Sequence, residues 1–264
     1  IGNIGGASMG LNIVFGIDTT TAAAISGILG ILLFASPKMG GVLDNTAKVL
    51  GTVMLVLIGY VAFSTNPPVA EAATHAVVPT NYPWLATITL IGGTVGGYIT
   101  FSGGHRLIDA GITGREHLKD VRRAAFMGMS VDAVVRILLF LAVLGVVSMG
   151  FALDPKDPAG SAFLLGAGEI GHKLFGIVFF CAALTSVVGA AYTSVSFLKT
   201  LFKVVERYEK LTIMAFIFVS TCILIFIGKP ATLLIVAGSV NGLILPVTLA
   251  VMLLATRKTN IVGD

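Results

Sequence analysis

Residues 89–114 read TLIGGTVGGYITFSGGHRLIDAGITG, and this stretch decides which kind of helical protein the chain forms. An apolar helical pattern runs up to the glycine pair Gly103–Gly104, is followed by His105, and then resumes. Glycine is costly inside a helix because its backbone loses the most freedom and it has no side chain to pack. The pair therefore predicts a helix that is interrupted in mid-segment. The alternative is an ordinary helix that ends at Phe101, with SGGHR as a loop in water.

The composition around this stretch predicts a membrane protein. Of 264 residues, 56% are hydrophobic and 11% are charged, and the mean hydropathy is +0.97. A soluble domain carries about 25% charged residues because its surface faces water. The net charge of +4 is compatible with nucleic-acid binding, but basic cytoplasmic loops explain the same excess in a membrane protein. We therefore expect the lipid bilayer as the main partner and no nucleic acid.

Hydropathy divides the chain into eight candidate transmembrane segments within one all-α domain, a polytopic membrane helix bundle. A crossing needs about 20 mostly apolar residues. Because the chain has no initiator Met and starts inside an apolar stretch, we expect it to be a fragment of a longer protein. The expected segments are 1–16, 18–35, 42–63, 84–104 (broken), 124–150, 172–198, 211–228 and 230–255.

The basic residues indicate how these segments are oriented. Alternate connections hold 13 of the 17 Lys and Arg residues, the other connections hold three, and Arg136 lies inside a segment. Cytoplasmic loops are the ones enriched in Lys and Arg. We therefore expect a multi-pass protein of the cell membrane, a bacterial inner membrane, with the 64–83 connection outside and the C-terminus in the cytoplasm.

Polar residues at membrane depth mark a candidate transport path. An interrupted span exposes backbone carbonyls and helix ends, which secondary transporters use to bind ions and substrates. We predict that Tyr98, Thr100, Ser102 and His105 line the break at Gly103.

Two ionisable residues lie one helical turn apart in the segment 124–150. Asp132 and Arg136 are at positions i and i+4, so they share a helix face and can pair. Ionisable residues inside a span face a bundle interior or a water-filled path. We predict either a structural ion pair or a proton or gating relay, which His105 would join because imidazole titrates near neutral pH.

Two further segments carry hydroxyl and amide groups. The segment 172–198 has a hydroxyl-bearing stripe that either offers oxygens to a hard cation or bonds its own backbone one turn earlier. The last segment carries Asn241 and then Pro246; Asn241 either bonds a neighbouring helix or contacts cargo. Nucleotide-binding and hydrolase motifs are missing, and we expect no enzymatic activity.

Three stretches together resemble the NRAMP family of divalent-metal transporters. GGASMGLNIVFGID (5–18) is similar to the family's third transmembrane helix, GGTVGGYITFSGGHR (92–106) to its broken sixth helix, and LLIVAGSVNGLILPVTLAVMLLATRKTNIVG (233–263) to its tenth. The resemblance implies a LeuT-type bundle of two inverted repeats and proton-linked uptake of a divalent metal. It covers the third to the tenth helix.

The departures from the family pattern concern the cargo. An Ala and a Met hold the metal in the family's sixth helix, and Gly97 and Thr100 stand at the matching positions here. Loss of the thioether leaves oxygen donors, which suit harder ions such as Mg²⁺ or Mn²⁺. Asn3 stands where the family's third helix has an acid, whereas Asp132 matches an acidic position in its seventh helix.

The resulting hypothesis is a secondary transporter that moves a divalent cation by alternating access, without a bound cofactor and with H⁺ as the candidate coupling ion. Its path would use Gly97, Tyr98, Thr100, Ser102, Gly103 and Asn241, with His105, Asp132 and Arg136 as the proton or gating relay. The alternative is a LeuT-fold symporter for a small organic solute such as an amino acid or related carboxylate.

Overall fold

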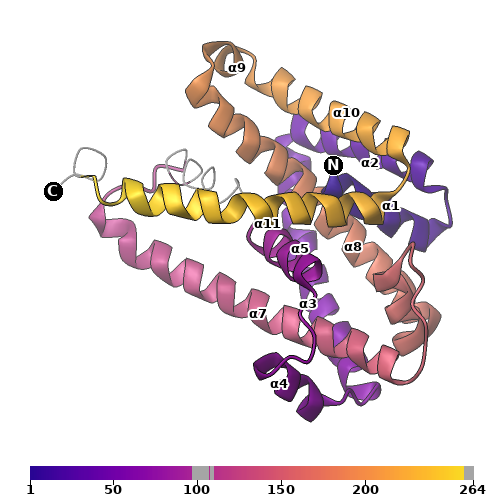
Figure 1. Cartoon of the computed structure of the whole chain (residues 1–264). Coiled ribbons are helices and arrows are strands. Elements are labelled where there is room, and N and C mark those ends of the chain that lie inside the picture. The colour runs from indigo at the N-terminus through magenta and orange to yellow at the C-terminus, as the bar shows by residue number, and fades with distance from the viewer. Residues whose placement is uncertain (97–106, 108–109, 259–264) are drawn as a thin grey trace.

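The computed structural model describes residues 1–96, 107 and 110–258. Within these residues the secondary structure is helical, with no strand, which confirms the all-α prediction. The helices are α1 (Gly2–Phe15), α2 (Thr19–Ala35), α3 (Pro37–Ser64), α4 (Val69–Val77), α5 (Trp84–Val95), the 3₁₀ turn η1 (Arg115–His117), α7 (Leu118–Ser148), α8 (Pro158–Leu201), α9 (Lys203–Arg207), α10 (Glu209–Ile227) and α11 (Pro230–Ala255) (Figure 1).

Four of the described helices are long and apolar enough to cross a bilayer: α7 (counted with η1), α8, α10 and α11. The number rises to six if each of two sharply bent pairs is one span. One pair is α1 with α2, bent by 118°, and the other is the end of α3 with α4, bent by 102°. The eight segments expected from the sequence count α1 and α2 as two separate crossings. At 14 and 17 residues, each is short for a crossing of about 20 residues.

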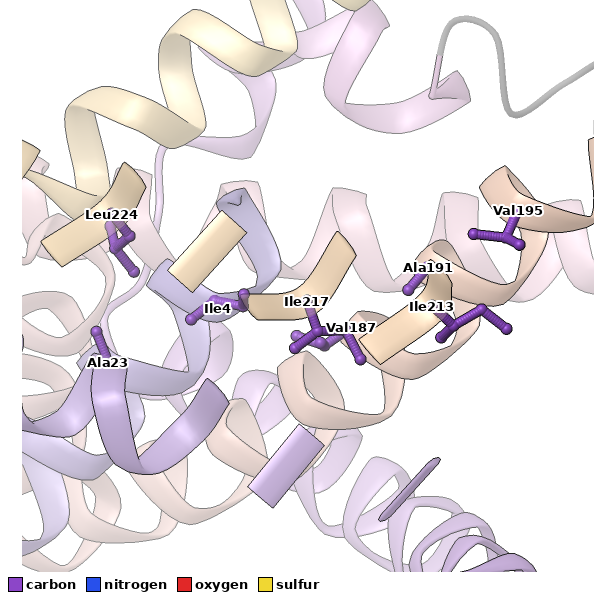
Figure 2. Packing of buried hydrophobic residues seen from close by; sticks show 8 residues of the cluster. All are labelled: Ile4, Ala23, Val187, Ala191, Val195, Ile213, Ile217 and Leu224. Atoms are coloured by element: carbon purple, nitrogen blue, oxygen red, sulfur yellow. The ribbon is translucent and has the colours of Figure 1, made fainter. Parts of the chain in front are cut away.

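Helix α8 is central to the packing. In the most apolar 18-residue stretch of α8, 39% of the residues are buried, compared with 17% in α7 and 22% in α11. One apolar cluster joins α8 to α1, α2 and α10, and Figure 2 shows its side chains gathered between these helices. Ile4, Val187 and Ile217 lie within it and are at most 5% exposed. A second cluster joins α8 to α3 and α7 through residues that include Ile58, Val146 and Phe163.

Small residues let α1 approach α8 closely. A Cβ atom at Gly10 would lie 2.7 Å from the Gly176 carbonyl oxygen and 2.7 Å from the Phe180 nitrogen, closer than real Cβ contacts. One turn earlier, Gly6 faces the Ala183 methyl group. Gly and Ala are the residues that permit such backbone approach in membranes. The glycines four residues apart in the sequence thus serve packing.

Much of α7 and α11 lies away from the rest of the bundle. Both helices extend toward the side of the C-terminus in Figure 1. Phe126, Met129 and Val134 on α7, and Leu243 and Leu253 on α11, are all more than half exposed. Lipid tails are as apolar as these side chains, so a membrane helix can carry such a surface without burying it in protein.

Candidate functional site

The helix α5 is too short to cross a membrane. Its 12 residues rise about 18 Å, against roughly 30 Å of hydrocarbon. It ends at Val95 because Gly96 adopts the left-handed conformation (φ 80°, ψ 22°), with the Gly96 N–H donating to the Gly92 carbonyl at 3.0 Å. This left-handed cap is a standard helix stop that favours glycine. The helix α5 therefore ends before Phe101, where the alternative placed its end. The interruption predicted at Gly103 lies outside the described residues and stays a prediction.

Backbone contact with α11 fixes the position of α5. A Cβ atom at Gly92 would overlap the Gly238 carbonyl oxygen and the Gly242 nitrogen, so these two backbones touch. From the other side, a Cβ atom at Gly238 would lie 2.9 Å from the Thr89 carbonyl oxygen. The Thr89 and Ser239 hydroxyl oxygens lie 2.6 Å apart and form an interhelical hydrogen bond. The end of α5 is therefore held against the middle of α11.

Asn241 lies on α11 within the same contact region, between Ser239 and Gly242. It is half-buried, and its side chain makes no hydrogen bond to any residue that the structure describes. Ser239, by contrast, bonds both Thr89 and the Ile235 carbonyl. An amide without a partner is costly in an apolar medium. Asn241 is therefore available to a group outside the described residues or to cargo.

The core of the predicted path lies outside the described residues. This applies to Gly97, Tyr98, Thr100, Ser102, Gly103 and His105. Their roles in binding a metal or relaying protons stay predictions. In sequence these residues follow shortly after α5, whose last carbonyl groups belong to residues up to Val95.

Asp132 and Arg136 form the ion pair that their spacing permits. The Arg136 Nε donates to Asp132 Oδ2 at 2.7 Å. The two side chains are 52% and 40% exposed on the outward part of α7. Each charge thus has its partner on its own helix, without help from another described helix. A relay role for this pair stays a prediction.

The hydroxyl-bearing stripe of α8 bonds its own backbone. Thr185, Ser186, Thr193 and Ser194 each donate to the carbonyl four residues earlier, at 2.7 to 2.9 Å. This is the second of the two outcomes left open by the sequence. The hydroxyl protons of these four residues are therefore used within α8 itself.

A small cavity beside Asn3 contains a polar residue that the sequence did not single out. The cavity has a volume of about 40 Å³ and lies between α1, α8 and α10. Asn3 and Ser220 provide its polar side chains, among apolar neighbours such as Val187 and Phe216. This is room for about two waters. Ser220 is one of three hydroxyl residues on α10, with Thr212 and Thr221, so the sequence does not single it out and only its place in the cavity with Asn3 does.

Among the described residues, no group of three or more His, Cys, Asp and Glu side chains lies close enough together to hold a metal ion. The polar groups described at the contact between α5 and α11 are the Thr89 and Ser239 hydroxyls, the Asn241 amide and the carbonyls at the end of α5. These features define a class of protein: a polytopic α-helical membrane protein in which a short, terminated helix is held against a full-length one.

The comparison with protein families gives the identity within this class. The sequence model described as "Nramp: Natural resistance-associated macrophage protein-like" matches residues 1–264, and the chain belongs to this family. The expected LeuT-type architecture fits this family. The match also confirms the resemblance seen in three stretches of the sequence.

Two bacterial relatives are about half identical to the chain. "Uncharacterized membrane protein YcsG" of Bacillus subtilis (strain 168) is 50% identical over 264 residues, which cover 100% of this chain and 65% of that protein. "Uncharacterized membrane protein" of Haemophilus influenzae (strain ATCC 51907 / DSM 11121 / KW20 / Rd) is 51% identical over 263 residues, 100% of this chain and 66% of that protein. The chain thus spans about 65% of the length of these relatives.

Proposed function

We propose that this protein is a secondary transporter that moves a divalent metal cation across a bacterial inner membrane by alternating access. The observation that carries the proposal is the end of α5 at Val95, held against α11, in a chain that matches the Nramp family over its whole length. Membership of this family of transporters favours transport over an enzymatic role.

The end of α5 has the chemistry that attracts a cation. The last carbonyls of a helix lack intrahelical partners, and the helix dipole places about half a negative charge there. In α5, the Gly92 carbonyl accepts from Gly96, which leaves the carbonyls of Gly93, Thr94 and Val95 at the end of the helix. Because the rise of α5 covers only part of a bilayer, these oxygens would lie inside the membrane rather than in bulk water.

The cargo we propose is a hard divalent cation, such as Mg²⁺ or Mn²⁺. Gly97 and Thr100 would complete the oxygen set after α5, and Asn241 would add an amide oxygen from α11. Carbonyl, hydroxyl and amide oxygens suit Mg²⁺ and Mn²⁺, whereas thioethers suit softer metals. Protons are the proposed coupling ion, with His105, Asp132 and Arg136 as the relay.

The orientation we propose places the C-terminus in the cytoplasm. Arg257 and Lys258 follow α11, and the start of α7 carries Lys119, Arg122 and Arg123. Lys and Arg near helix ends favour the cytoplasmic side. Both relatives are bacterial membrane proteins by their printed names and sources, which supports a bacterial inner membrane.

Flux measurements in proteoliposomes test this function. We expect the full-length protein to take up Mg²⁺ or Mn²⁺ above empty liposomes, and an imposed proton gradient to change the rate. Asn241→Ala should reduce uptake, while its exposed apolar neighbour serves as the control in Val240→Ala. Uptake of an amino acid or related carboxylate, with no uptake of Mg²⁺, Mn²⁺ or Fe²⁺, would refute the metal cargo.

A further inference from the structure

Helix α8 is broken near its start, and an aromatic stack holds the two halves together. Gly168 departs from helical geometry (φ 68°, ψ −171°) and divides the 44 residues of α8. Phe163 lies before the break and Phe175 after it, with ring centroids 4.5 Å apart and an interplanar angle of 14°. Both rings are at most 3% exposed. This apolar contact keeps the halves close but carries no charge.

A second contact across the break joins two ionisable side chains, Asp157 and His172. Asp157 caps the start of α8, where its Oδ1 accepts from the Gly160 N–H at 2.9 Å. Its other oxygen, Oδ2, lies 4.0 Å from Nε2 of His172, which follows the break. The Asp157 and His172 side chains are 22% and 19% exposed, so water screens them less than a surface pair.

Helix α1 packs on both halves of α8 at this place. Cβ atoms built at Gly160 and at Gly176 would each approach Ile13 to 2.9 Å or less. Gly160 lies before the break and Gly176 after it. A change of angle at Gly168 would therefore move one of the two surfaces that hold Ile13. Gly168 is thus a joint in α8, and α1 packs against the helix on both sides of it.

The charged groups around the pair are few. Burial raises the pKa of the Asp157 carboxyl, while the hydrogen bond from Gly160 and the charge of His172 act in the opposite direction. Asp154 in the preceding loop also raises the pKa of Asp157. Lys156 in that loop and Glu169 and Lys173 on α8 are exposed. The side chains from other segments that meet Gly160, Gly166, Gly171 and Gly176 of α8 carry no charge; they are Ile13, Val14, Leu57, Val61, Thr65 and Val146.

We propose that Asp157 and His172 form a proton-binding latch that holds the two halves of α8 together across Gly168. A proton on His172 creates the ion pair with the Asp157 carboxylate, and its loss removes the pair. Imidazole changes charge between about pH 5 and 8. The latch is therefore closed when His172 carries a proton and Asp157 is ionised, and it is released when either group becomes neutral. This inference does not depend on the transported cargo.

Hydrogen exchange of the backbone amides in residues 158–171 tests the latch, in the full-length protein in lipid nanodiscs. We compare wild type with His172→Gln at the same pH, so that the intrinsic pH dependence of exchange cancels. At about pH 5.5 the variant should exchange roughly three- to fivefold faster, as expected for a partly screened ion pair. At about pH 8.5, where imidazole side chains are in general neutral, the proposal expects the two proteins to exchange alike.

Two more variants separate charge from capping and from general damage. Asp157→Asn keeps an oxygen for the Gly160 N–H, because Asn is a good helix cap, but removes the carboxylate. It should match His172→Gln at acid pH, and the double variant should add nothing. His75→Gln disrupts an exposed pair with Glu71 at 3.7 Å and should leave residues 158–171 unchanged. Equal effects of His172→Gln at both pH values, additive effects of the two changes, or no effect at acid pH would overturn the proposal.

Discussion

Neighbouring glycines on α5 offer a matched test of the contact with α11. A Cβ atom at Gly92 would overlap backbone atoms of Gly238 and Gly242 and would lie 2.7 Å from the Gly242 Cα. A Cβ atom at Gly93 meets nothing within 4 Å. Both residues lie in the same helix, so Gly92→Ala and Gly93→Ala make the same chemical change in two different surroundings.

The magnitude follows from the required movement. Ordinary contacts to a Cβ atom begin near 3.4 Å, so α5 and α11 must separate by about 1 Å or more to accept Gly92→Ala. The atoms in the way belong to the backbone and cannot rotate aside. Overpacking of this kind costs about 1–3 kcal/mol. Gly93→Ala pays no such cost and gains up to about 1 kcal/mol in helix propensity.

Metal uptake and thermal stability are the assays. Gly92→Ala should lower the apparent Tm and reduce uptake at least several-fold, whereas Gly93→Ala should keep or raise the Tm and retain uptake. A Gly92→Ala protein with normal uptake and Tm would show that α5 is not held against α11 as described. Equal loss in both variants would show that α5 needs flexible glycines rather than a close contact.

Three further predictions concern packing and polar groups. Gly10→Val should prevent α1 from packing against α8 and lower the yield of folded protein, measured by size-exclusion chromatography. Its control is Gly59→Val, which should be tolerated because a Cβ atom there meets nothing within 4 Å. Equal yields of the two variants would contradict the contact between α1 and α8. Asn12→Leu removes the hydrogen bond from Nδ2 to the Ile17 carbonyl at 2.7 Å and should lower the stability by about 1 kcal/mol, measured as a lower Tm. An unchanged Tm would show that this hydrogen bond does not contribute to stability. Thr89→Val removes the bond to Ser239 and should cost about 1 kcal/mol, with Thr94→Val, which removes only a local bond to Leu90, as the control.

The sequence alone was sufficient to predict interactions that lie within one helix or follow helical spacing. Asp132 and Arg136 pair because four residues make about one turn, which the sequence alone states. Gly6 and Gly10 face α8 for the same reason, since four-residue spacing keeps small residues on one side of a helix. The sequence could indicate that this side packs closely, but not that α8 is the partner.

The breaks were harder to place because distant residues select them. Glycine pairs occur at 92–93, 96–97 and 103–104, and each can end a helix as far as local propensity is concerned. Gly96 is the residue that ends α5, one turn after Gly92 meets Gly238 and Gly242, which are more than 140 residues away in the chain. The position of the break at Gly168 also depends on residues outside the local sequence. The stretch LLGAGEIG holds three spaced glycines and gives no local signal for which of them breaks the helix. The contacts of Phe163 with Phe175 and of Asp157 with His172 lie on either side of the break at Gly168. In a membrane an interrupted helix must satisfy or shield its exposed backbone. The contacts that make a break tolerable therefore decide its position, and those contacts come from other parts of the fold.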